Sequence, residues 1–101
     1  MTDRGYYGGL IRLHLVHHAS ARPLYGLAMI EELSRHGYRL SPGTLYPIPH
    51  GLEKKGYLRS TERRLGRTAR RMYRITPSGR CALEGAKQKV YELFGEMFLR
   101  R

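Results

Sequence analysis

Polar and cationic side chains recur between Leu40 and Leu58 at positions that a helix would bring to one face. They supply hydroxyl, imidazole and ammonium groups, and they are Thr44, Tyr46, His50, Lys54 and Lys55. Groups of these types hydrogen-bond to phosphates and to the base edges of nucleic acids. They therefore predict a binding surface, although the solvated face of an ordinary amphipathic helix has a similar composition.

The helix that would carry this face has clear start and stop signals. Ser41 can cap its first turn, Pro42 suits the first helical position, and Gly56 can end it in the left-handed conformation. The apolar face at helical spacing consists of Leu45, Ile48 and Leu52. An interior proline costs about 3 kcal/mol and a glycine about 1 kcal/mol, so Pro49 and Gly51 predict a kink or partial unwinding mid-helix.

Arginines crowd the region that follows this helix. Seven of them lie between positions 59 and 74: Arg59, Arg63, Arg64, Arg67, Arg70, Arg71 and Arg74. The interleaved apolar and β-branched residues predict two strands, Tyr57–Glu62 and Arg71–Ile75, joined by a turn centred on Gly66. A helix is the alternative, which Gly66 disfavours. Because like charges repel, such a hairpin is expected to be looser without an anion.

The chain of 101 residues has the length of one domain and is strongly basic, with 19 Lys and Arg against 8 Asp and Glu and a formal net charge of +11. This excess predicts a polyanionic partner, either nucleic acid or an acidic membrane surface, in preference to charge kept for solubility alone. The single cysteine, Cys81, excludes an internal disulfide, fits a reducing compartment and is expected to be buried. No apolar run approaches the roughly 18 residues of a membrane span.

The C-terminal segment predicts a long helix with a wide apolar face. Thr76 can cap this helix and Pro77 suits its first position. The candidate interface residues at heptad-like spacing are Leu83, Ala86, Val90, Leu93, Phe94 and Met97. Such a seam favours self-association, while packing back onto its own domain is the alternative. Tyr91, Phe94 and Phe98 form a candidate site for a small aromatic effector, unless they only fill the interface.

One polar segment and two apolar segments precede these elements. Residues 1–9 are polar and rich in glycine, and they are expected to be loose at the tip. The spacing of apolar residues in Leu10–Ala19 fits a strand or a helix equally. Leu24–His36 favours a helix that Gly37 closes.

Residue patterns that would support catalysis or metal binding are weak. His14, His17 and His18 have a spacing compatible with a metal ion, but no cysteine pair or carboxylate cluster accompanies them. No nucleophile–base pair, acid pair or phosphate-binding loop is recognisable. We therefore expect no metal site, no cofactor and no enzymatic activity.

Three stretches of the chain carry a family resemblance: PLYGLAMIEEL (23–33), SPGTLYPIPHGLEKKGYL (41–58) and RRMYRITPSGRCAL (70–83). Together they resemble the PadR family of transcriptional regulators. The second is similar to that family's recognition-helix pattern, roughly S-x-G-T-L-Y-P, two hydrophobic residues and L-E-x-x-G. Order and spacing agree over roughly residues 10–83. Pro49 and Gly51 depart from the pattern, where the family usually has a leucine and often a basic residue.

The resemblance implies an α+β, mainly α fold. It would be a winged helix-turn-helix with a three-helix core and a two-stranded wing, plus one long C-terminal dimerisation helix. Leu10–Ala19 would then be the first helix. Residues 1–76 would form the DNA-binding domain and residues 77–101 the dimerisation helix, as in the short-tailed members of the family.

Charge and resemblance together predict a cytoplasmic, homodimeric regulator that binds double-stranded DNA sequence-specifically, most simply as a repressor. The expected DNA-binding residues are Tyr25, Ser41, Thr44, Tyr46, His50, Lys54, Lys55, Arg63, Arg64, Arg67, Arg70 and Arg71. A winged-helix module that binds protein or RNA without an operator is the alternative. A membrane-surface role for the C-terminal helix is disfavoured, because dimerisation would cover its apolar face.

Overall fold

The first helix lies at the centre of the core. The computed structural model describes residues 2–99, and its α1 (Arg4–Ala21) starts at Asp3, whose carboxylate accepts a hydrogen bond from the Tyr6 N–H at 3.1 Å. The glycine-rich segment is therefore helical from Arg4 onward, because an aspartate cap starts the helix early; the tip that is expected to be loose includes Met1, which lies outside the described residues. The ambiguous spacing that follows is helical, and its buried residues are Ile11, Leu15, Val16 and Ala19.

A two-residue strand, β1 (Leu24–Tyr25), separates α1 from α2 (Gly26–Arg35). The helix predicted from Leu24 is wrong in these first two positions. Leu24 pairs with Tyr73, and Tyr25 with Met72, in an antiparallel ladder. This pairing with a strand far along the sequence overrides the local preference, which is a weak guide for so short a segment.

The end of α2 is as predicted from Gly37. This glycine has a φ of 87°, and the Tyr38 N–H donates to the Leu33 carbonyl at 2.9 Å. The bond turns the chain away from α2 and toward the next helices.

The single helix predicted for the following stretch is divided into α3 (Pro42–Leu45) and α4 (Pro47–Lys54). The division falls at Tyr46, whose N–H donates to the Pro42 carbonyl at 3.0 Å. The next residue, Pro47, has no N–H with which to continue the ladder. It does suit the first position of α4, where a missing donor costs little.

Pro49 does not interrupt α4, contrary to the expected distortion. Its ring is fully buried, in the same row as the buried side chains of Leu45 and Leu52. Pro49 lies in the first turn of α4, where a backbone N–H has no intrahelical partner, so its missing donor costs little and its ring adds to the buried apolar surface. Pro49 is therefore a core residue, and Pro47 is the proline at which the helix divides.

The wing is an antiparallel hairpin of β2 (Leu58–Leu65) and β3 (Thr68–Ile75). Both strands reach further toward the turn than the sequence predicted. The turn is at Gly66 as predicted, with a φ of 65° at the first of its two central positions, where a type II′ turn takes glycine. Because β1 also pairs with β3, the strand order is β1-β3-β2, and a third short strand joins the predicted two.

The last helix, α5 (Pro77–Phe94), begins where predicted, because the Thr76 hydroxyl accepts a hydrogen bond from the Gly79 N–H at 2.9 Å. A side chain at Gly79 would overlap the Tyr57 carbonyl, so this glycine allows α5 to pack closely on the start of the wing. A π-helical turn, η1 (Gly95–Leu99), continues α5. Residues 100 and 101 of the expected dimerisation helix lie outside the described residues.

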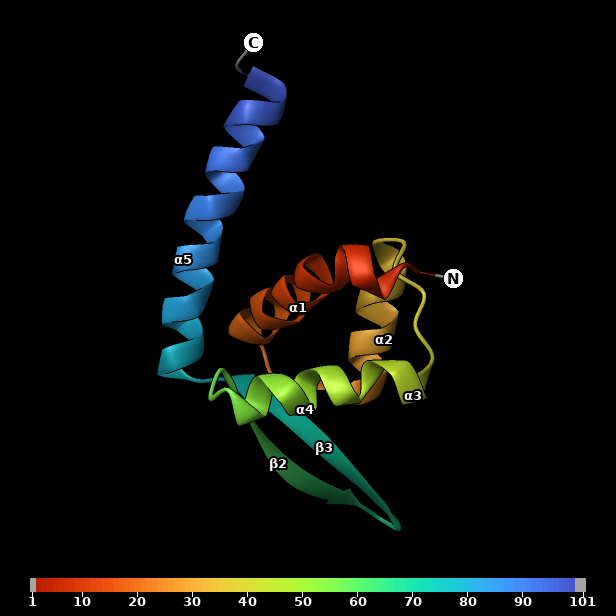
Figure 1. Cartoon of the computed structure of the whole chain (residues 1–101). Coiled ribbons are helices and arrows are strands. Elements are labelled where there is room, and N and C mark those ends of the chain that lie inside the picture. The colour runs from red at the N-terminus through yellow and green to blue at the C-terminus, as the bar shows by residue number, and fades with distance from the viewer. Residues whose placement is uncertain (1, 100–101) are drawn as a thin grey trace.

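The elements form a helical body with two projections. In Figure 1, α1, α2, α3 and α4 make up the body, the hairpin projects from its lower end, and α5 rises away at one side. The buried cluster consists of Ile11, Leu15, Val16, Ala19, Leu24, Met29, Leu33, Leu45, Leu52, Leu58, Tyr73 and Leu83. The radius of gyration, 14.6 Å, exceeds the roughly 13 Å of a compact domain of this length because α5 extends outward.

Two further expectations concern the surface. Burial is predicted for Cys81, but this residue is exposed on the outer side of α5 because Leu83 occupies the position that faces the core. Among the helices of residues 2–99, none is both long and apolar enough to cross a membrane.

A half-buried carboxylate holds the wing against α4. Glu53 of α4 accepts hydrogen bonds from the Ser60 N–H at 3.0 Å and from the Ser60 hydroxyl at 2.8 Å. Arg71 of β3 donates to the same hydroxyl at 2.9 Å. Burial alone would raise the pKa of the Glu53 carboxyl, but the Ser60 hydrogen bonds and the charges of Arg71 and His50 lower this pKa below its ordinary value.

We expect Glu53→Gln to lower the free energy of unfolding by about 1–2 kcal/mol at neutral pH, since it weakens hydrogen bonds to a charged acceptor. The folded-state pKa of Glu53 is depressed, so its contribution is present above the unfolded-state value of about 4.3 and is lost as the pH falls through the folded-state value. The difference between wild type and variant should therefore shrink on acidification. Urea denaturation of both proteins at successively lower pH measures this difference in the free energy of unfolding.

The matched control is Glu62→Gln, which removes an exposed carboxylate from β2. This control should show a smaller loss at neutral pH. A Glu53→Gln defect that stays constant across the acid range would contradict the assignment of the ionised carboxylate as the anchor.

Candidate nucleic-acid interface

The outward face of α3 and α4 is set by what they bury. Leu45, Pro49 and Leu52 are buried in the core and Ile48 packs partly against it, so the polar residues of these helices are left on the outer side. Tyr46 is 45% exposed, and His50 and Lys54 follow it at intervals of four, on the same side of the helix. The adjacent Lys55 is also exposed, whereas Thr44 is half-buried. The predicted polar face is therefore present as a row of accessible side chains.

The start of α3 differs from the predicted cap. The Ser41 backbone carbonyl accepts hydrogen bonds from the N–H groups of Thr44 and Leu45, at 3.1 and 2.9 Å. The Ser41 hydroxyl instead donates to the Thr44 hydroxyl at 3.2 Å. Ser41 holds the N-cap position without a side-chain bond to the backbone, because its hydroxyl is engaged by Thr44. Both hydroxyls lie at the end of the helix where free N–H groups favour anions.

Tyr46 reaches across to the beginning of α2. A Cβ added to Gly26 would lie 2.6 Å from the Tyr46 ring, so only a glycine allows this approach. The ring lies at one side of a groove of about 380 Å³ whose lining also includes Tyr25, Arg70 and Arg71. The Arg70 guanidinium lies 5.9 Å from the centre of the Tyr25 ring. The structure thus brings together four predicted DNA-binding residues from three elements.

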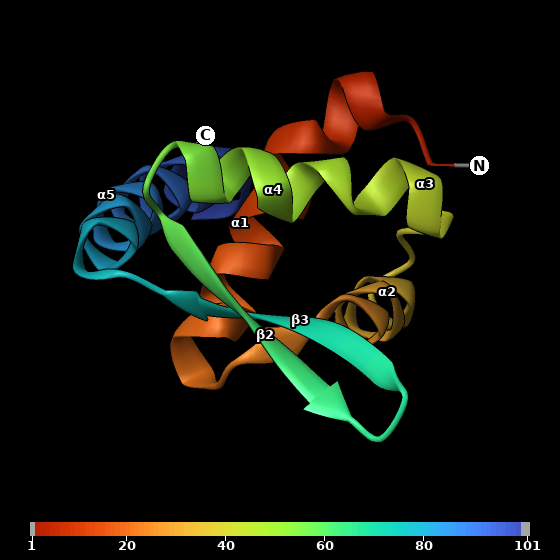
Figure 2. The same cartoon turned by 90° about the horizontal axis from the view of Figure 1, so that it is seen from below.

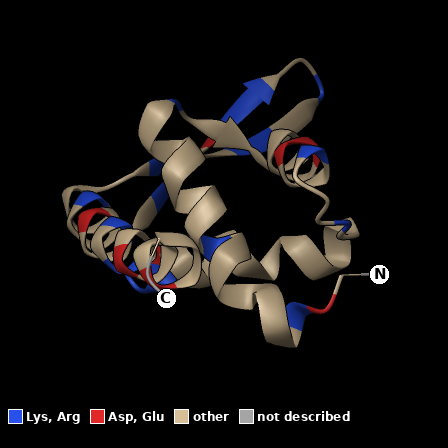
Figure 3. Cartoon of the chain, turned by 90° about the horizontal axis from the view of Figure 1, so that it is seen from above, with Lys and Arg blue, Asp and Glu red and all other residues tan. Residues whose placement is uncertain are grey.

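The wing arginines carry charge that the protein does not neutralise. All of Arg63, Arg64, Arg67 and Arg70 are exposed, and none forms an ion pair within residues 2–99. Arg63 lies directly opposite Arg70 in the register, a like-charge pair that destabilises a hairpin. Figure 3 shows Lys and Arg along the hairpin, whereas on α5 they alternate with Asp and Glu.

The helices α3 and α4 and the wing lie at the same end of the molecule. Figure 2 shows α3 and α4 lying beside the hairpin across this end, with the beginning of α2 next to them. Direct packing of α4 on β2 fixes this arrangement, through Glu53 and Ser60. Neither of these anchoring residues is among those predicted from the sequence. The glutamate of the L-E-x-x-G pattern was the signal that could have identified one of them.

The predicted interface residues of α5 divide into two groups. Leu83 is buried in the domain's own core and Ala86 is half-buried. The exposed fractions of the others are Val90 47%, Leu93 55%, Phe94 50% and Met97 63%. The far part of α5 and the η1 turn, which carries Met97, therefore present an uncovered apolar surface, while the first turns of α5 pack into the core of the helical body.

An apolar groove of about 710 Å³ runs between α1 and α5. Its lining residues are Leu10, Leu13, His14, His17, Leu83, Lys87, Val90, Tyr91 and Phe94. Of the three residues predicted for an effector, Tyr91 and Phe94 line this groove. Phe98 lies beyond the groove, with its ring centre 5.1 Å from that of Phe94.

Comparison with known proteins agrees with this architecture. Residues 15–85 match the sequence model of the transcriptional regulator PadR-like family. The chain is 47% identical over 94 residues to the transcriptional regulator Rv3488 of Mycobacterium tuberculosis, a match that covers 93% of this chain and 88% of the relative.

Solved structures show the same fold. A PadR family transcriptional regulator from Eggerthella lenta superimposes with a TM-score of 0.76 at 29% identity, covering 93% of this chain and 85% of that one. Bacillus subtilis PadR, solved in complex with operator DNA, gives a TM-score of 0.68 at 16% identity over 75% of this chain and 46% of its own. The extent of the family match and the identity to the mycobacterial relative lead to one conclusion: the chain belongs to the PadR-like family of transcriptional regulators.

Proposed function

We propose that this protein is a homodimeric, sequence-specific repressor that binds double-stranded DNA. The observation that carries the proposal is the position of the outward row of α4 beside the arginine-rich hairpin, at one end of the molecule. One surface therefore combines hydrogen-bonding side chains with cationic charge that has no ion-pair partner among the described residues. The Bacillus subtilis relative of the same fold was solved with operator DNA, which supports this use of the surface.

The contacts would divide between sequence reading and backbone binding. Tyr46, His50 and Lys54 are spaced to follow a major groove along α4, with the hydroxyls of Ser41 and Thr44 and the amine of Lys55 reaching phosphates. The residues of the wing that would bind the backbone are Arg63, Arg64, Arg67 and Arg70. Tyr25 and Arg71 would line the groove between these two regions. Phosphate contacts supply affinity, and the few base contacts supply specificity.

Dimerisation would be the role of the exposed part of α5. Val90, Leu93 and Met97 lie on one side of a helix that extends from the body. A second copy that covers this surface would remove apolar area from water, which stabilises the dimer by about 25 cal/mol for each Å² buried. Residues 1–76 would then be the DNA-binding part and residues 77–101 the dimerisation part, with Leu83 joining the two because it is buried in the core.

Repression would follow if the bound dimer occluded a promoter, with two half-sites about one helical turn apart. A small aromatic effector could act through the groove that includes Tyr91 and Phe94, because the groove joins the dimerisation helix to α1. The proposed location is the cytoplasm, since a bacterial-type regulator acts where the chromosome is. A protein- or RNA-binding module is the competing function.

We expect Arg67→Ala to weaken binding to all DNA duplexes alike. Arg67 is exposed at the tip of the hairpin, so the substitution removes a cation that would pair with a phosphate and leaves base reading unchanged. The slope of log K against log salt should decrease by about 0.9 for each phosphate that the variant no longer neutralises. Anisotropy titrations at several salt concentrations measure this slope.

The matched control is Lys89→Ala, which removes one positive charge from α5, away from the hairpin. Its slope should stay close to that of wild type. If Arg67→Ala and Lys89→Ala changed the slope equally, the wing would have no specific role in binding phosphates.

We expect Leu93→Asp to convert the protein to a monomer, because a carboxylate would enter the centre of the apolar surface of α5. DNA affinity should fall with it, since one half-site is then bound at a time. Sedimentation velocity measures the change. Gln88→Asp places the same charge on the opposite side of α5 and should remain dimeric; a dimeric Leu93→Asp variant would exclude this surface as the interface.

A further inference from the structure

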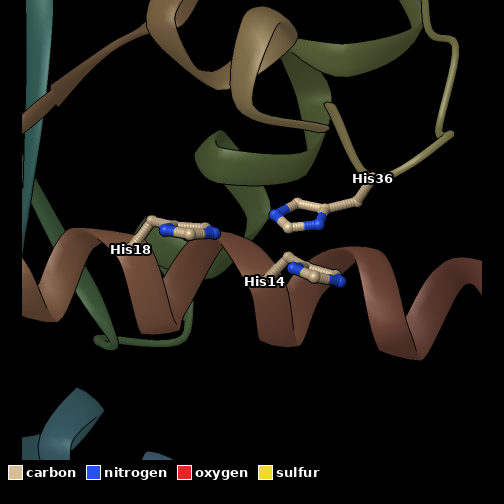
Figure 4. A group of neighbouring side chains, drawn as sticks. All are labelled: His14, His18 and His36. Carbon is tan, nitrogen blue, oxygen red and sulfur yellow. The ribbon is translucent and has the colours of Figure 1, made fainter. Parts of the chain in front are cut away.

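Three histidines meet between the first two helices. His14 and His18 lie one turn apart on α1, and His36 caps the end of α2. Figure 4 shows all three imidazoles gathered in the space between these elements. Each offers a ring nitrogen, and these nitrogens lie within 4.8 Å of one another. In the sequence, His17 also has metal-binding spacing with His14 and His18. In the fold, His17 lies outside the cluster, and the third imidazole comes from His36, which lies far along the chain.

A carboxylate completes the cluster. Glu32 lies one turn before His36 on α2, and its Oε2 is 3.7 Å from His18 Nε2 and 3.6 Å from His36 Nε2. Its Oε1 accepts a hydrogen bond from Arg35 at 2.9 Å, which holds the carboxylate in this orientation. Two facing helices thus each contribute a pair of donors at a spacing of four residues, a spacing that places both donors on one side of a helix.

The spacing of these atoms approaches that of a metal coordination shell. Ligands at about 2.0–2.1 Å from a tetrahedral zinc ion are about 3.3–3.4 Å from one another. The two distances from Glu32 to the histidine nitrogens are only slightly longer than this. The histidine nitrogens lie within 4.8 Å of one another, so they would have to draw together by up to about 1.5 Å. The three rings are stacked in the free protein and would have to turn so that their nitrogens converge, which changes of the side-chain torsions allow.

The surroundings of His14 and His18 favour the neutral imidazole. His18 Nε2 is buried and has no hydrogen-bond partner among the described residues. Burial and the neighbouring imidazoles lower the pKa of His14, and burial lowers the pKa of His18 against the opposing charge of Glu32. A neutral imidazole has a free lone pair for a metal, whereas an imidazolium has none.

We propose that His14, His18, His36 and Glu32 form a binding site for one divalent transition-metal ion of the zinc class. Three imidazoles and one carboxylate are a donor set that suits Zn²⁺, Co²⁺ or Ni²⁺ and disfavours Mg²⁺ and Ca²⁺, which take oxygen ligands. The ion would join the middle of α1 to the end of α2, from which Gly37 and Tyr38 lead to α3. Metal binding would therefore stabilise the body on which the proposed DNA-binding helices are mounted.

The site is independent of the proposed DNA binding and can be tested on the free protein. Isothermal titration of the full chain with ZnCl₂ should give about one ion per chain and a Kd below about 10 µM. Addition of Co²⁺ should produce visible absorption bands of the intensity typical of a tetrahedral site. Mg²⁺ at the same concentration should give neither heat nor a thermal shift.

Variants identify the ligands. His36→Ala changes a partly exposed side chain at a helix end and should weaken Zn²⁺ binding at least tenfold while leaving circular dichroism unchanged. Glu32→Gln should weaken it to a similar degree, because the carboxylate charge is lost. The matched control is His17→Ala, which removes an exposed imidazole of α1 outside the cluster and should bind as wild type does.

Two results would overturn the proposal. The first is the absence of Zn²⁺ binding to wild type at micromolar concentrations, which would leave the cluster as stacked imidazoles that pack with Tyr38. The second is binding that His36→Ala and Glu32→Gln leave intact, since the ion would then lie elsewhere on the chain.

Discussion

The burial of Leu45, Pro49 and Leu52 is the constraint on which the rest of the structure depends. These three side chains are buried in the core, and by their burial they determine that Tyr46, His50 and Lys54 face outward. A helix interior normally excludes proline at a cost of about 3 kcal/mol. Here both prolines lie in the first turn of α4, where no hydrogen bond of this helix is lost, and Pro49 also packs as an apolar core residue, so the chain keeps a short helix with a fixed outer face. Rotation of this helix by one residue would bury polar groups and expose the core.

The wing depends on this helix for its position. Its ladder runs the full length of β2 and β3, yet Arg63 faces Arg70 and the charges are not neutralised by acidic residues of the hairpin. Glu53, through Ser60, ties the hairpin to α4 at the end near the body, while the tip carries free charge. The arrangement favours a polyanionic partner, because binding one relieves the repulsion that the free protein tolerates. The exposed apolar surface of α5 would likewise be stabilised by a partner that covers it.

Signals carried by adjacent residues were sufficient to predict much of this fold. Gly37, Gly66 and the Thr76–Pro77 pair marked ends and turns correctly, since each acts through its own backbone conformation or a bond to a near neighbour. Features that depend on distant residues were missed. Strand β1 exists because Leu24 finds Tyr73, and the histidine cluster exists because α2 brings His36 to α1. At the candidate interface the residue types were predicted, but the close approach of the Tyr46 ring to Gly26 was not. This contact forms only when α2 packs against the start of α4, and the sequence does not show that packing.

The proposal to be tested is the specific recognition of a DNA operator by a dimer. It is supported by family membership, by the charged end of the molecule and by the uncovered apolar surface of the last helix. The most direct measurement is fluorescence anisotropy of the protein on a duplex from the upstream region of its own gene, at near-physiological salt, with unrelated duplex as competitor. We predict binding that survives about a thousandfold excess of competitor, and selection from random duplexes should recover one symmetric site. Binding that the competitor abolishes, together with no enriched sequence in that selection, would contradict the claim.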